Sequence, residues 1–275
     1  MRKVIFLSFA IIDIITLYPV SEFCCIYVSN TSINPTISNN KVYGNNAGGI
    51  QLNGDRYMGG TGIISNAKIL GNIIFNNGKI GGAALNLDGV QFSKIYNNLL
   101  YDNQATGIAI FKGDGGDGSK NNKIYNNTVI MPKNSRWCIL FKNESSNNTF
   151  FNNICINQDN YKGSIYIDKT SLAGFKSDYN ALTPIFNIDG KQTIKNLSLW
   201  QKLTGNDINS LSVNSPHSLF NYKLKQFIPL KNSQLINSGD INTSSSHDIL
   251  ANKRKNTPDI GAFESKLEEL DKENQ

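Results

Sequence analysis

Cysteine, histidine and charged residues are all scarce in this sequence. Its 275 residues include only 4 cysteines and 2 histidines, and charged residues make up 17% of the chain. No C-x-x-C pair or Cys/His spacing typical of zinc sites occurs, so we interpret the cysteines as small buried hydrophobic residues. His217 and His247 have no motif around them, and no Ser/His/Asp or Cys/His triad spacing is visible. A zinc domain and a triad hydrolase are therefore disfavoured.

Runs of basic residues interleaved with aromatic residues are also missing. The formal net charge is +6, and five acids fall in the last dozen residues, so the preceding chain is more basic still. A basic chain favours an anionic partner such as an acidic polysaccharide, nucleic acid or a charged surface. Because no Lys/Arg-rich run with aromatics is present, acidic polysaccharide is the preferred partner and no nucleic-acid partner is expected.

A long uninterrupted apolar run is absent as well. Arg2 and Lys3 precede an apolar segment, residues 4–17, that three polar residues interrupt. The segment is too short for a good membrane-spanning helix, so we expect no stable membrane span. A basic start followed by an apolar stretch is typical of a secretory signal, which predicts a secreted or cell-surface protein. No clear A-x-A cleavage site follows, and a hydrophobic segment that caps one end of the fold is the alternative.

Helical periodicity is missing from the middle of the chain, where a repeat of about 26 residues is found instead. β-Branched and aromatic residues lie between Asn and Gly residues, a pattern that predicts short strands. One Asn recurs in register at spacings of 32, 26, 29 and 26 residues, and a second follows five residues later in the first three copies. Pro132 and Gln158 replace the second Asn in the last two copies. The first set is Asn40, Asn72, Asn98, Asn127 and Asn153, and the second is Asn45, Asn77 and Asn103.

This repeat predicts a solenoid of stacked parallel coils. Coils stack about 4.8 Å apart, so equivalent side chains lie one strand spacing from each other. Asn tolerates the left-handed backbone conformation that a corner requires, and its amide can hydrogen-bond to the equivalent amide of the next coil. The recurring Asn is therefore predicted to be an internal strut at a corner, with Ile, Leu and Val stacked beside it in the core.

Residues 26–264 resemble right-handed parallel β-helix proteins of the pectin-lyase-like type. The resemblance is carried by IYVSNTSINPT (26–36), GIAIFKGDGGDGSKNNKIYNNTVI, SLWQKLTGNDINS (198–210) and a closing segment (residues 233–264) that contains SQLINSG and HDILANKRKNTPDIGAFE. In the closing segment, Asp248, Arg254, Asp259, Gly261 and Glu264 stand at the family positions, which mark architecture rather than chemistry. Several coils that usually precede the first Asn coil are missing, so the chain resembles a shortened member.

The predicted fold is all-β, a right-handed parallel β-helix with an irregular C-terminal excursion and a capping segment. Residues 1–25 are expected to form the signal or the hydrophobic cap, and residues 26–180 the coils. Residues 181–264 are expected to form the excursion and closing segment, and residues 265–275 a disordered tail. A short helix over residues 197–203 should pack Trp200 against the solenoid and cover its end, because an open terminal coil exposes unpaired strand edges. We expect a monomer.

Three aspartates are the candidates for binding substrate. Counting eleven residues from the second Asn of each of the first three copies gives Arg56, Asp88 and Asp114. Hard oxygen ligands at strand spacing suit calcium, and the resemblance implies that calcium at Asp88 and Asp114 would bridge an acidic sugar. Asp117 lies in the glycine-rich loop KGDGGDGSK, where it can approach a ligand. The alternative is that all three are ordinary turn aspartates.

Lys112 and Arg136 are the candidate catalytic residues. β-Elimination requires a base and a cation that stabilises the enolate-like carboxylate. The alternative is that each of the two residues is a solvated surface charge without a catalytic role. Two functions follow: a secreted or cell-surface β-helix protein that binds acidic polysaccharide without catalysis, or a polysaccharide lyase that cleaves a uronic-acid polymer. The shortened chain favours the first.

Overall fold

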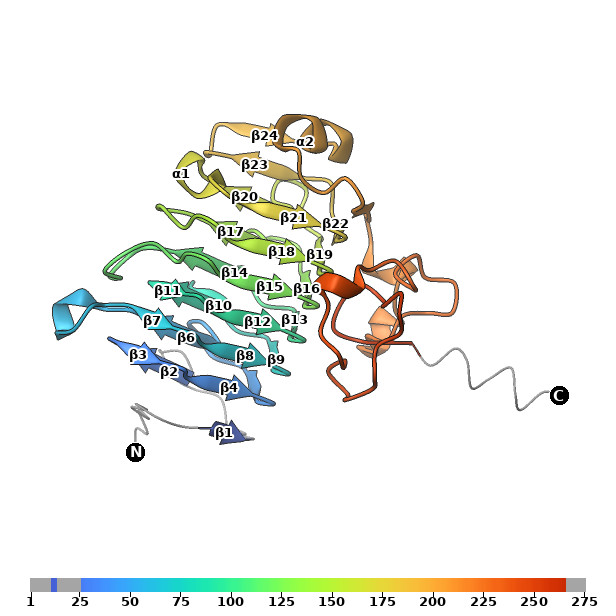
Figure 1. The fold of residues 1–275 in the computed structure, drawn as a ribbon. Helices are drawn as coiled ribbons and strands as arrows, with labels where there is room; N and C mark the ends of the chain where they lie inside the picture. Colours follow the sequence, from blue (N-terminus) through green and yellow to red (C-terminus); the bar gives the residue numbers. More distant parts are fainter. Residues whose placement is uncertain (1–10, 14–25, 266–275) are drawn as a thin grey trace.

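Short strands make up most of the computed structural model, which describes residues 11–13 and 26–265 (Figure 1). Apart from the strand β1 (Ile11–Asp13), which pairs with β4, the predicted signal or cap lies outside the described residues. The predicted tail lies outside them beyond residue 265.

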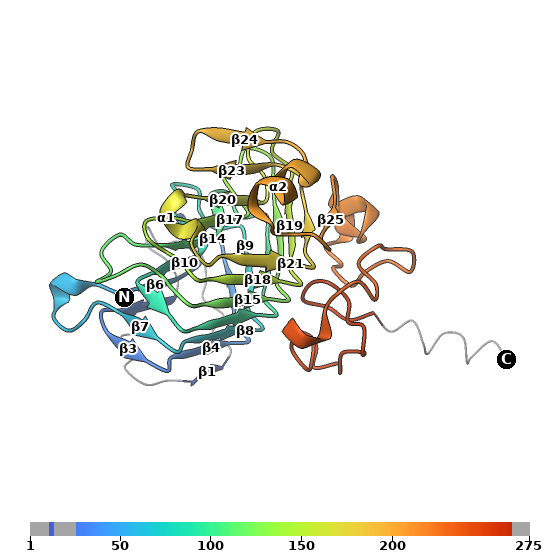
Figure 2. The same ribbon diagram turned by 45° about the horizontal axis from the view of Figure 1, so that its top comes forward.

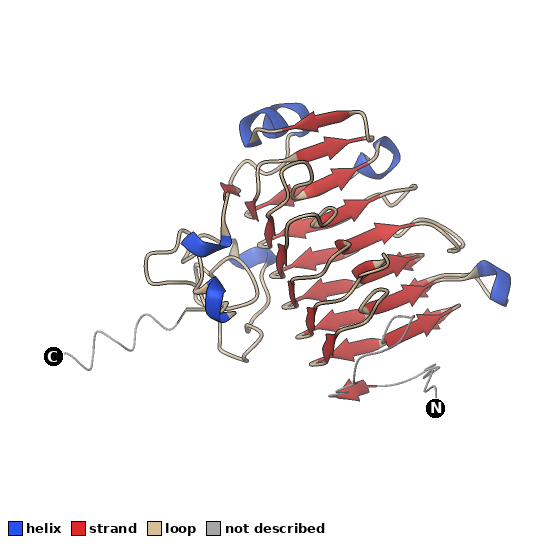
Figure 3. Ribbon diagram, turned by 180° about the vertical axis from the view of Figure 1, so that it is seen from behind, coloured by secondary structure: helices blue, strands red, loops and turns tan. Residues whose placement is uncertain are grey.

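Equivalent strands of successive coils stack into four sheets, and each sheet extends from coil to coil along the axis of the solenoid (Figures 1 and 3). Sheet A contains β1, β4 (Thr36–Ser38), β8 (Lys68–Leu70), β12 (Lys94–Tyr96), β15 (Lys123–Tyr125), β18 (Thr149–Phe151) and β21 (Lys176–Asp178). Sheet B contains β2 (Ile26–Ser29), β6 (Ile50–Asn53), β10 (Ala83–Asp88), β14 (Thr106–Phe111), β17 (Ile139–Phe141), β20 (Ile165–Ile167), β23 (Phe186–Ile188) and β24 (Gln192–Ile194). Sheet C contains β3 (Ser32–Ile33), β7 (Ile64–Ser65) and β11 (Val90–Gln91). Sheet D contains β5 (Lys41–Tyr43), β9 (Ile73–Phe75), β13 (Leu99–Tyr101), β16 (Thr128–Met131), β19 (Ile154–Asn157), β22 (Ala181–Leu182) and β25 (Leu211–Ser212).

Parallel pairing joins the neighbouring strands of each sheet, and β23 and β24 are the antiparallel exception. The predicted all-β parallel solenoid is therefore confirmed. The pairing continues through β22, β23 and β25, so the coils extend beyond residue 180, where the sequence pattern fades. The helical elements are α1 (Lys169–Leu172), α2 (Leu197–Thr204), η1 (Arg56–Met58), η2 (Pro216–Ser218), η3 (Tyr222–Leu224) and η4 (Ile241–Thr243).

Alternation along the strands of sheet A separates the core from the outer face. Successive strand residues point to opposite sides, so the middle residue of a three-residue strand points inward when its neighbours point outward. The middle residues of five strands stack in the core and are at most 1% exposed. They are Ile37, Ile69, Ile95, Ile124 and Phe150.

The recurring asparagines form the two internal ladders predicted from their spacing. In the first ladder, Nδ2 of Asn98 donates to Oδ1 of Asn127 at 2.9 Å, and Asn127 donates to Asn153 at 2.9 Å. In the second, Asn77 donates to Asn103 at 3.0 Å. A third ladder was not predicted: Ser93 donates its backbone N–H to Oδ1 of Asn122, and Asn122 donates to Asn148. Buried amides of this kind are stable only because each finds its partner in the next coil.

The left-handed corner falls on the residue before the ladder Asn, which corrects the prediction that one Asn does both. Positive φ angles occur at Asn97 (52°), Asn126 (50°) and Asn152 (55°). We call these three the outer asparagines, because their side chains face the C-terminal part of the chain. Oδ1 of Asn126 accepts from Oγ of Ser244 at 2.9 Å, and Oδ1 of Asn152 accepts from the backbone N–H of Asp240 at 2.8 Å.

Residues 213–265 cover the outer face of the middle strands of sheet D, from β13 to β22, which are consequently buried on both sides (Figures 1 and 3). Ile130 and Ile154 pack there with Phe220, Leu235 and Ile260 in a second hydrophobic cluster. Sheet faces buried on both sides are expected to be rich in branched apolar residues, as sheet D is.

The closing-segment residues that resemble the family positions form a buried polar network. Arg254 donates from Nη1 to Glu264 at 3.1 Å, and from Nη2 to the Gly261 carbonyl and to Oδ1 of Asn97. Asp248 accepts the backbone N–H of Glu264 at 2.9 Å. Because a buried guanidinium is costly without partners, this network fixes the closing segment to the coils.

The predicted short helix is confirmed as α2, which lies over the last coils (Figure 2). Trp200 is fully buried and stacks on Phe186 with ring centroids 4.7 Å apart. Its Nε1 donates to Asp207 at 2.8 Å, and Asp207 also accepts Nδ2 of Asn180 at 3.0 Å. The first ladder continues from Asn153 to Asn180, and there Asp207 and Ser210 together replace the next Asn, because Oγ of Ser210 accepts the backbone N–H of Asn180.

Candidate functional site

Asp88 lies beneath the glycine-rich loop rather than on a surface. It is 2% exposed, and its carboxylate accepts the backbone N–H groups of Gly113, Asp114 and Gly115 at 2.8, 2.8 and 3.1 Å. A Cβ at Gly115 would lie 2.8 Å from Oδ1 of Asp88, which explains the glycine there. Burial raises the pKa of Asp88, and the three N–H groups act in the opposite direction. The carboxylate thus holds the loop in place.

Asp114 and Asp117 lie in that loop. The Asp114 side chain is exposed, and its carbonyl accepts the backbone N–H of Arg56 at 3.2 Å. Asp117 is paired with Nζ of Lys120 at 2.7 Å. Burial raises the pKa of Asp117, but the hydrogen bonds from Lys120 and Gly118 outweigh this and lower it. Within residues 26–265, no three His, Cys, Asp or Glu side chains form a group that could hold a metal ion, and calcium at Asp88 and Asp114 stays a prediction.

Lys112 and Arg136 are not brought together. Lys112 follows β14, where Nζ is 3.0 Å from the Glu144 carboxylate. Arg136 precedes β17, and its backbone N–H donates to the carbonyl of Ala105 before β14. Because β14 and β17 pair in parallel, the two cations lie at opposite ends of the strands, roughly 20 Å apart. This separation does not suit a base and a cation that act on one sugar.

A lysine column on the outer face of sheet A is the feature that sequence reasoning missed. The strand register aligns Lys68, Lys94, Lys123, Thr149 and Lys176. All four lysines are exposed, and none takes part in an ion pair among the described residues. Since neighbouring strands lie about 4.8 Å apart, this is a row of three adjacent positive charges without acidic partners in the described part of the chain, followed by a fourth beyond Thr149.

A column of aromatic residues runs beside the lysines, two residues further along each strand. Tyr96, Tyr125 and Phe151 are aligned, and the two tyrosine rings stack with centroids 4.9 Å apart and an angle of 3°. Burial, with a smaller contribution from Tyr96, raises the pKa of Tyr125 to about 12. Its hydroxyl therefore keeps its proton at neutral pH and remains a hydrogen-bond donor.

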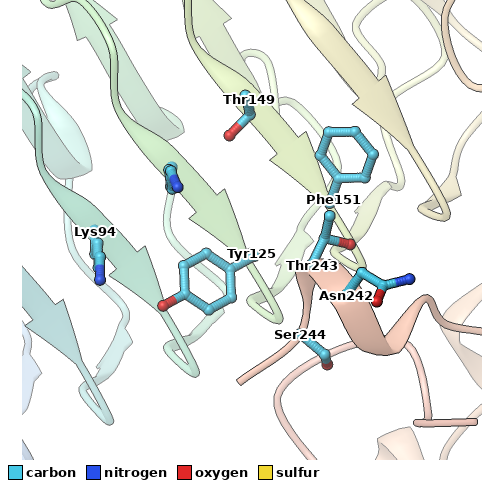
Figure 4. Close-up of a pocket in the computed structure, with 8 residues that line it drawn as sticks. Lys94, Tyr125, Thr149, Phe151, Asn242, Thr243 and Ser244 are labelled. Atoms are coloured by element: carbon cyan, nitrogen blue, oxygen red, sulfur yellow. The ribbon is translucent and has the colours of Figure 1, made fainter. Parts of the chain in front are cut away.

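A pocket of about 280 Å³ lies where these two columns meet the closing segment (Figure 4). Its floor is formed by sheet A, and its wall by the residues of and next to η4. The outer asparagines hold this wall, because Asn126 binds Ser244 and Asn152 binds Asp240. The lining residues are Lys94, Lys123, Tyr125, Thr149, Phe151, Asn242, Thr243 and Ser244.

Comparison with known proteins agrees with the observed coils. Residues 20–183 of the 275 match the family model described as a right-handed beta helix region. The chain belongs to the right-handed β-helix family. The solved structure of pectate lyase Pel9A is similar over 86% of this chain and 70% of that chain, with 14% sequence identity and a TM-score of 0.43. No curated protein matches the chain significantly.

The outer face of sheet B has a different character and is half-buried or buried at the positions that align along it. Gln51, Asn86, Ala109, Leu140 and Tyr166 are aligned there, and none is charged. The lysine column is thus a property of one face and not of the stacked coils in general. In residues 26–265, the helices lack the length and hydropathy to cross a bilayer.

The sequence of the β-helix did contain a signal for the lysine column. A lysine stands four residues before a ladder Asn in four copies, as in KIYNN before Asn98 and again before Asn127. Strand alternation then places that lysine outward, since the Ile that follows it points into the core. The wall of the pocket had no such signal, because its residues stand 91 to 150 positions after the sheet A residues that they face.

Proposed function

We propose that this β-helix protein binds an acidic polysaccharide along the outer face of sheet A and does not cleave it. The observation that carries the proposal is the lysine column, four exposed cations in register without acidic partners. Two unit charges 4 Å apart repel by about 1 kcal/mol even in water, so such a column is unfavourable unless an anion neutralises it. An anionic polymer supplies negative charges at repeated intervals and can follow an open face.

The non-catalytic form of the proposal is supported by the separation of the candidate catalytic residues. Lys112 is paired with Glu144, and Arg136 lies at the other end of the paired strands. The alternative, a lyase acting on a uronic-acid polymer, therefore has less support than binding.

Binding to soluble acidic polysaccharides by calorimetry, at low and at physiological ionic strength, tests the proposal. The double variant Lys94→Gln/Lys123→Gln should bind about fivefold to thirtyfold more weakly, at 0.5 to 1 kcal/mol for each exposed charge contact. The double variant Lys133→Gln/Lys202→Gln removes the same charge away from sheet A and should bind like the parent. Equal losses in both variants would mean that only net charge matters.

A variant that gains affinity tests the same proposal more specifically than a variant that loses it. Thr149 interrupts the lysine column, so Thr149→Lys should complete it and raise the affinity up to about fivefold. Asn86→Lys adds the same charge to the outer face of sheet B and serves as the matched control. Appearance of unsaturated ends during incubation, abolished in Lys112→Ala or Arg136→Ala, would instead establish the lyase.

We also propose that the protein acts outside the cell or on its surface. The basic and apolar start of the sequence supports export, and an acidic polysaccharide is a partner that an exported protein would meet. Mass spectrometry of the N-terminus of the protein recovered from culture medium tests this. An intact Met1 on protein confined to the cytoplasm would refute it.

A further inference from the structure

The pocket in sheet A carries a more specific inference, which rests on the proposed function. We propose that it binds a tetrahedral oxyanion, a phosphate or sulfate ester of the polymer, in preference to a carboxylate. The inference concerns which acidic group the polysaccharide carries and where that group is bound.

Unused donors converge on this pocket from three successive coils. Nζ of Lys94 and of Lys123, Oη of Tyr125 and Oγ1 of Thr149 all line it, and none makes a hydrogen bond within the described part of the chain. Figure 4 shows the Tyr125 hydroxyl directed toward the Lys94 side of the pocket. An anion placed here would therefore gain charge-assisted hydrogen bonds without displacing existing ones.

The wall contributes shape rather than further donors for the anion. Oγ1 of Thr243 already donates to the Asp240 carboxylate at 2.9 Å, and Oγ of Ser244 donates to Asn126 at 2.9 Å. Two acids lie near the pocket, and both are outside its lining. Asp240 is held by Thr243 and Asn242. Asp178, the register partner of Phe151 on the next strand, accepts hydrogen bonds from Asn209. The lining consequently carries positive charge without any negative charge, and Phe151 supplies an apolar surface for the carbon atoms of the ester.

The number and placement of the donors distinguish the two classes of anion. The lining has no arginine, whose two-pronged guanidinium pairs with carboxylates and phosphates alike, so recognition here depends on lysines and hydroxyls. Lysine ammonium groups and hydroxyls are single-point donors, and lysine is a common phosphate ligand. Four separate donors spread over two side-chain columns and three coils of one face can contact a tetrahedral group at several oxygens, whereas a carboxylate offers two oxygens in one plane. The volume of about 280 Å³ fits one monomer rather than a larger ligand.

The test compares three soluble polymers of matched length with one charge per monomer: a polyuronate, a sulfated glucan and a polyol-phosphate polymer. In competition against one labelled polymer, the sulfate or the phosphate polymer should bind at least about tenfold more tightly than the polyuronate. The better of the two identifies the source of the oxyanion. Equal binding of all three would overturn this inference and leave the proposed function intact, whereas no binding would refute both.

A matched pair of tyrosine variants locates the selectivity. Tyr125→Phe removes the hydroxyl and keeps the stacked ring, so it should reduce the preference for the tetrahedral anion about tenfold while binding of polyuronate changes little. Tyr96→Phe makes the same change in the neighbouring ring, which does not line the pocket, and should leave the preference unchanged. An unchanged preference in Tyr125→Phe would contradict the assignment.

Discussion

Adjacent asparagines at one corner of the coil have opposite roles. Asn127 points inward and hydrogen-bonds to the equivalent Asn residues of the coils on either side. Asn126 takes the left-handed conformation and points outward to the closing segment. Both are buried, but Asn127 is buried by the stacking of coils and Asn126 by a distant part of the chain. The same residue type is thus required for an amide ladder in one position and for backbone conformation and docking in the other.

In the early coils, the outer position requires the left-handed backbone conformation but not the contact with the closing segment. Asn39 stands at the equivalent corner with a φ of 56°, and its side chain is exposed. Gly71 occupies the next corner with a φ of 65°. Where the closing segment does not reach, the corner therefore requires only a positive φ, which Gly and Asn both supply.

The largest expected effect on the free energy of unfolding comes from a change in the first asparagine ladder. Asn127→Leu removes the donor to Asn153 and to two carbonyls, and it leaves Asn98 without its acceptor. At 1 to 3 kcal/mol for each buried group left unpaired, we expect a loss of about 3–5 kcal/mol in the free energy of unfolding. Urea denaturation measures it. A loss below about 1 kcal/mol would mean that the ladder is not a main source of stability.

A smaller and more local loss of stability is expected from a change at one of the outer asparagines. Asn126→Gly keeps the left-handed conformation but removes the acceptor for Ser244 and Ser245, at a cost of about 1–2 kcal/mol. Limited proteolysis and hydrogen exchange should show the closing segment opening while the coils stay protected. If the coils open together with it, the closing segment is part of one cooperative unit.

The smallest effect is expected from Asn39→Gly, the matched control. This side chain makes no hydrogen bond within the described residues, and glycine accepts the same backbone conformation. The free energy of unfolding should change by less than about 0.5 kcal/mol. A loss as large as that of Asn126→Gly would show that the outer position has a stabilising role independent of the closing segment.

The inner ladder could be predicted from the sequence because the repeat spacing brings identical residues together. Asn98, Asn127 and Asn153 need only a common register to become partners, and the register follows from the alignment of the copies. The division of roles within each Asn pair could not be predicted, since both residues tolerate the left-handed conformation and the sequence does not state which adopts it.

The candidate site shows where such reasoning stops. Asp88 was singled out as a possible ligand, yet a carboxylate is also what a loop of free backbone N–H groups requires, and one sequence does not separate these uses. The lysine column follows from the register once the inward Ile is recognised. The pocket depends on contacts such as Asn126 with Ser244, 118 residues apart, and no local pattern encodes them.

The lysine column makes the length of the proposed binding face depend on the number of coils. Each coil of 26 to 29 residues between Asn72 and Asn153 adds one outward position beside one ring position. Duplication of a coil would therefore lengthen the face by one step of about 4.8 Å and leave every existing neighbour pair unchanged. Under the proposed function, a gene that gains or loses whole repeats changes how many units of a polymer the protein would hold, without altering the chemistry of each contact.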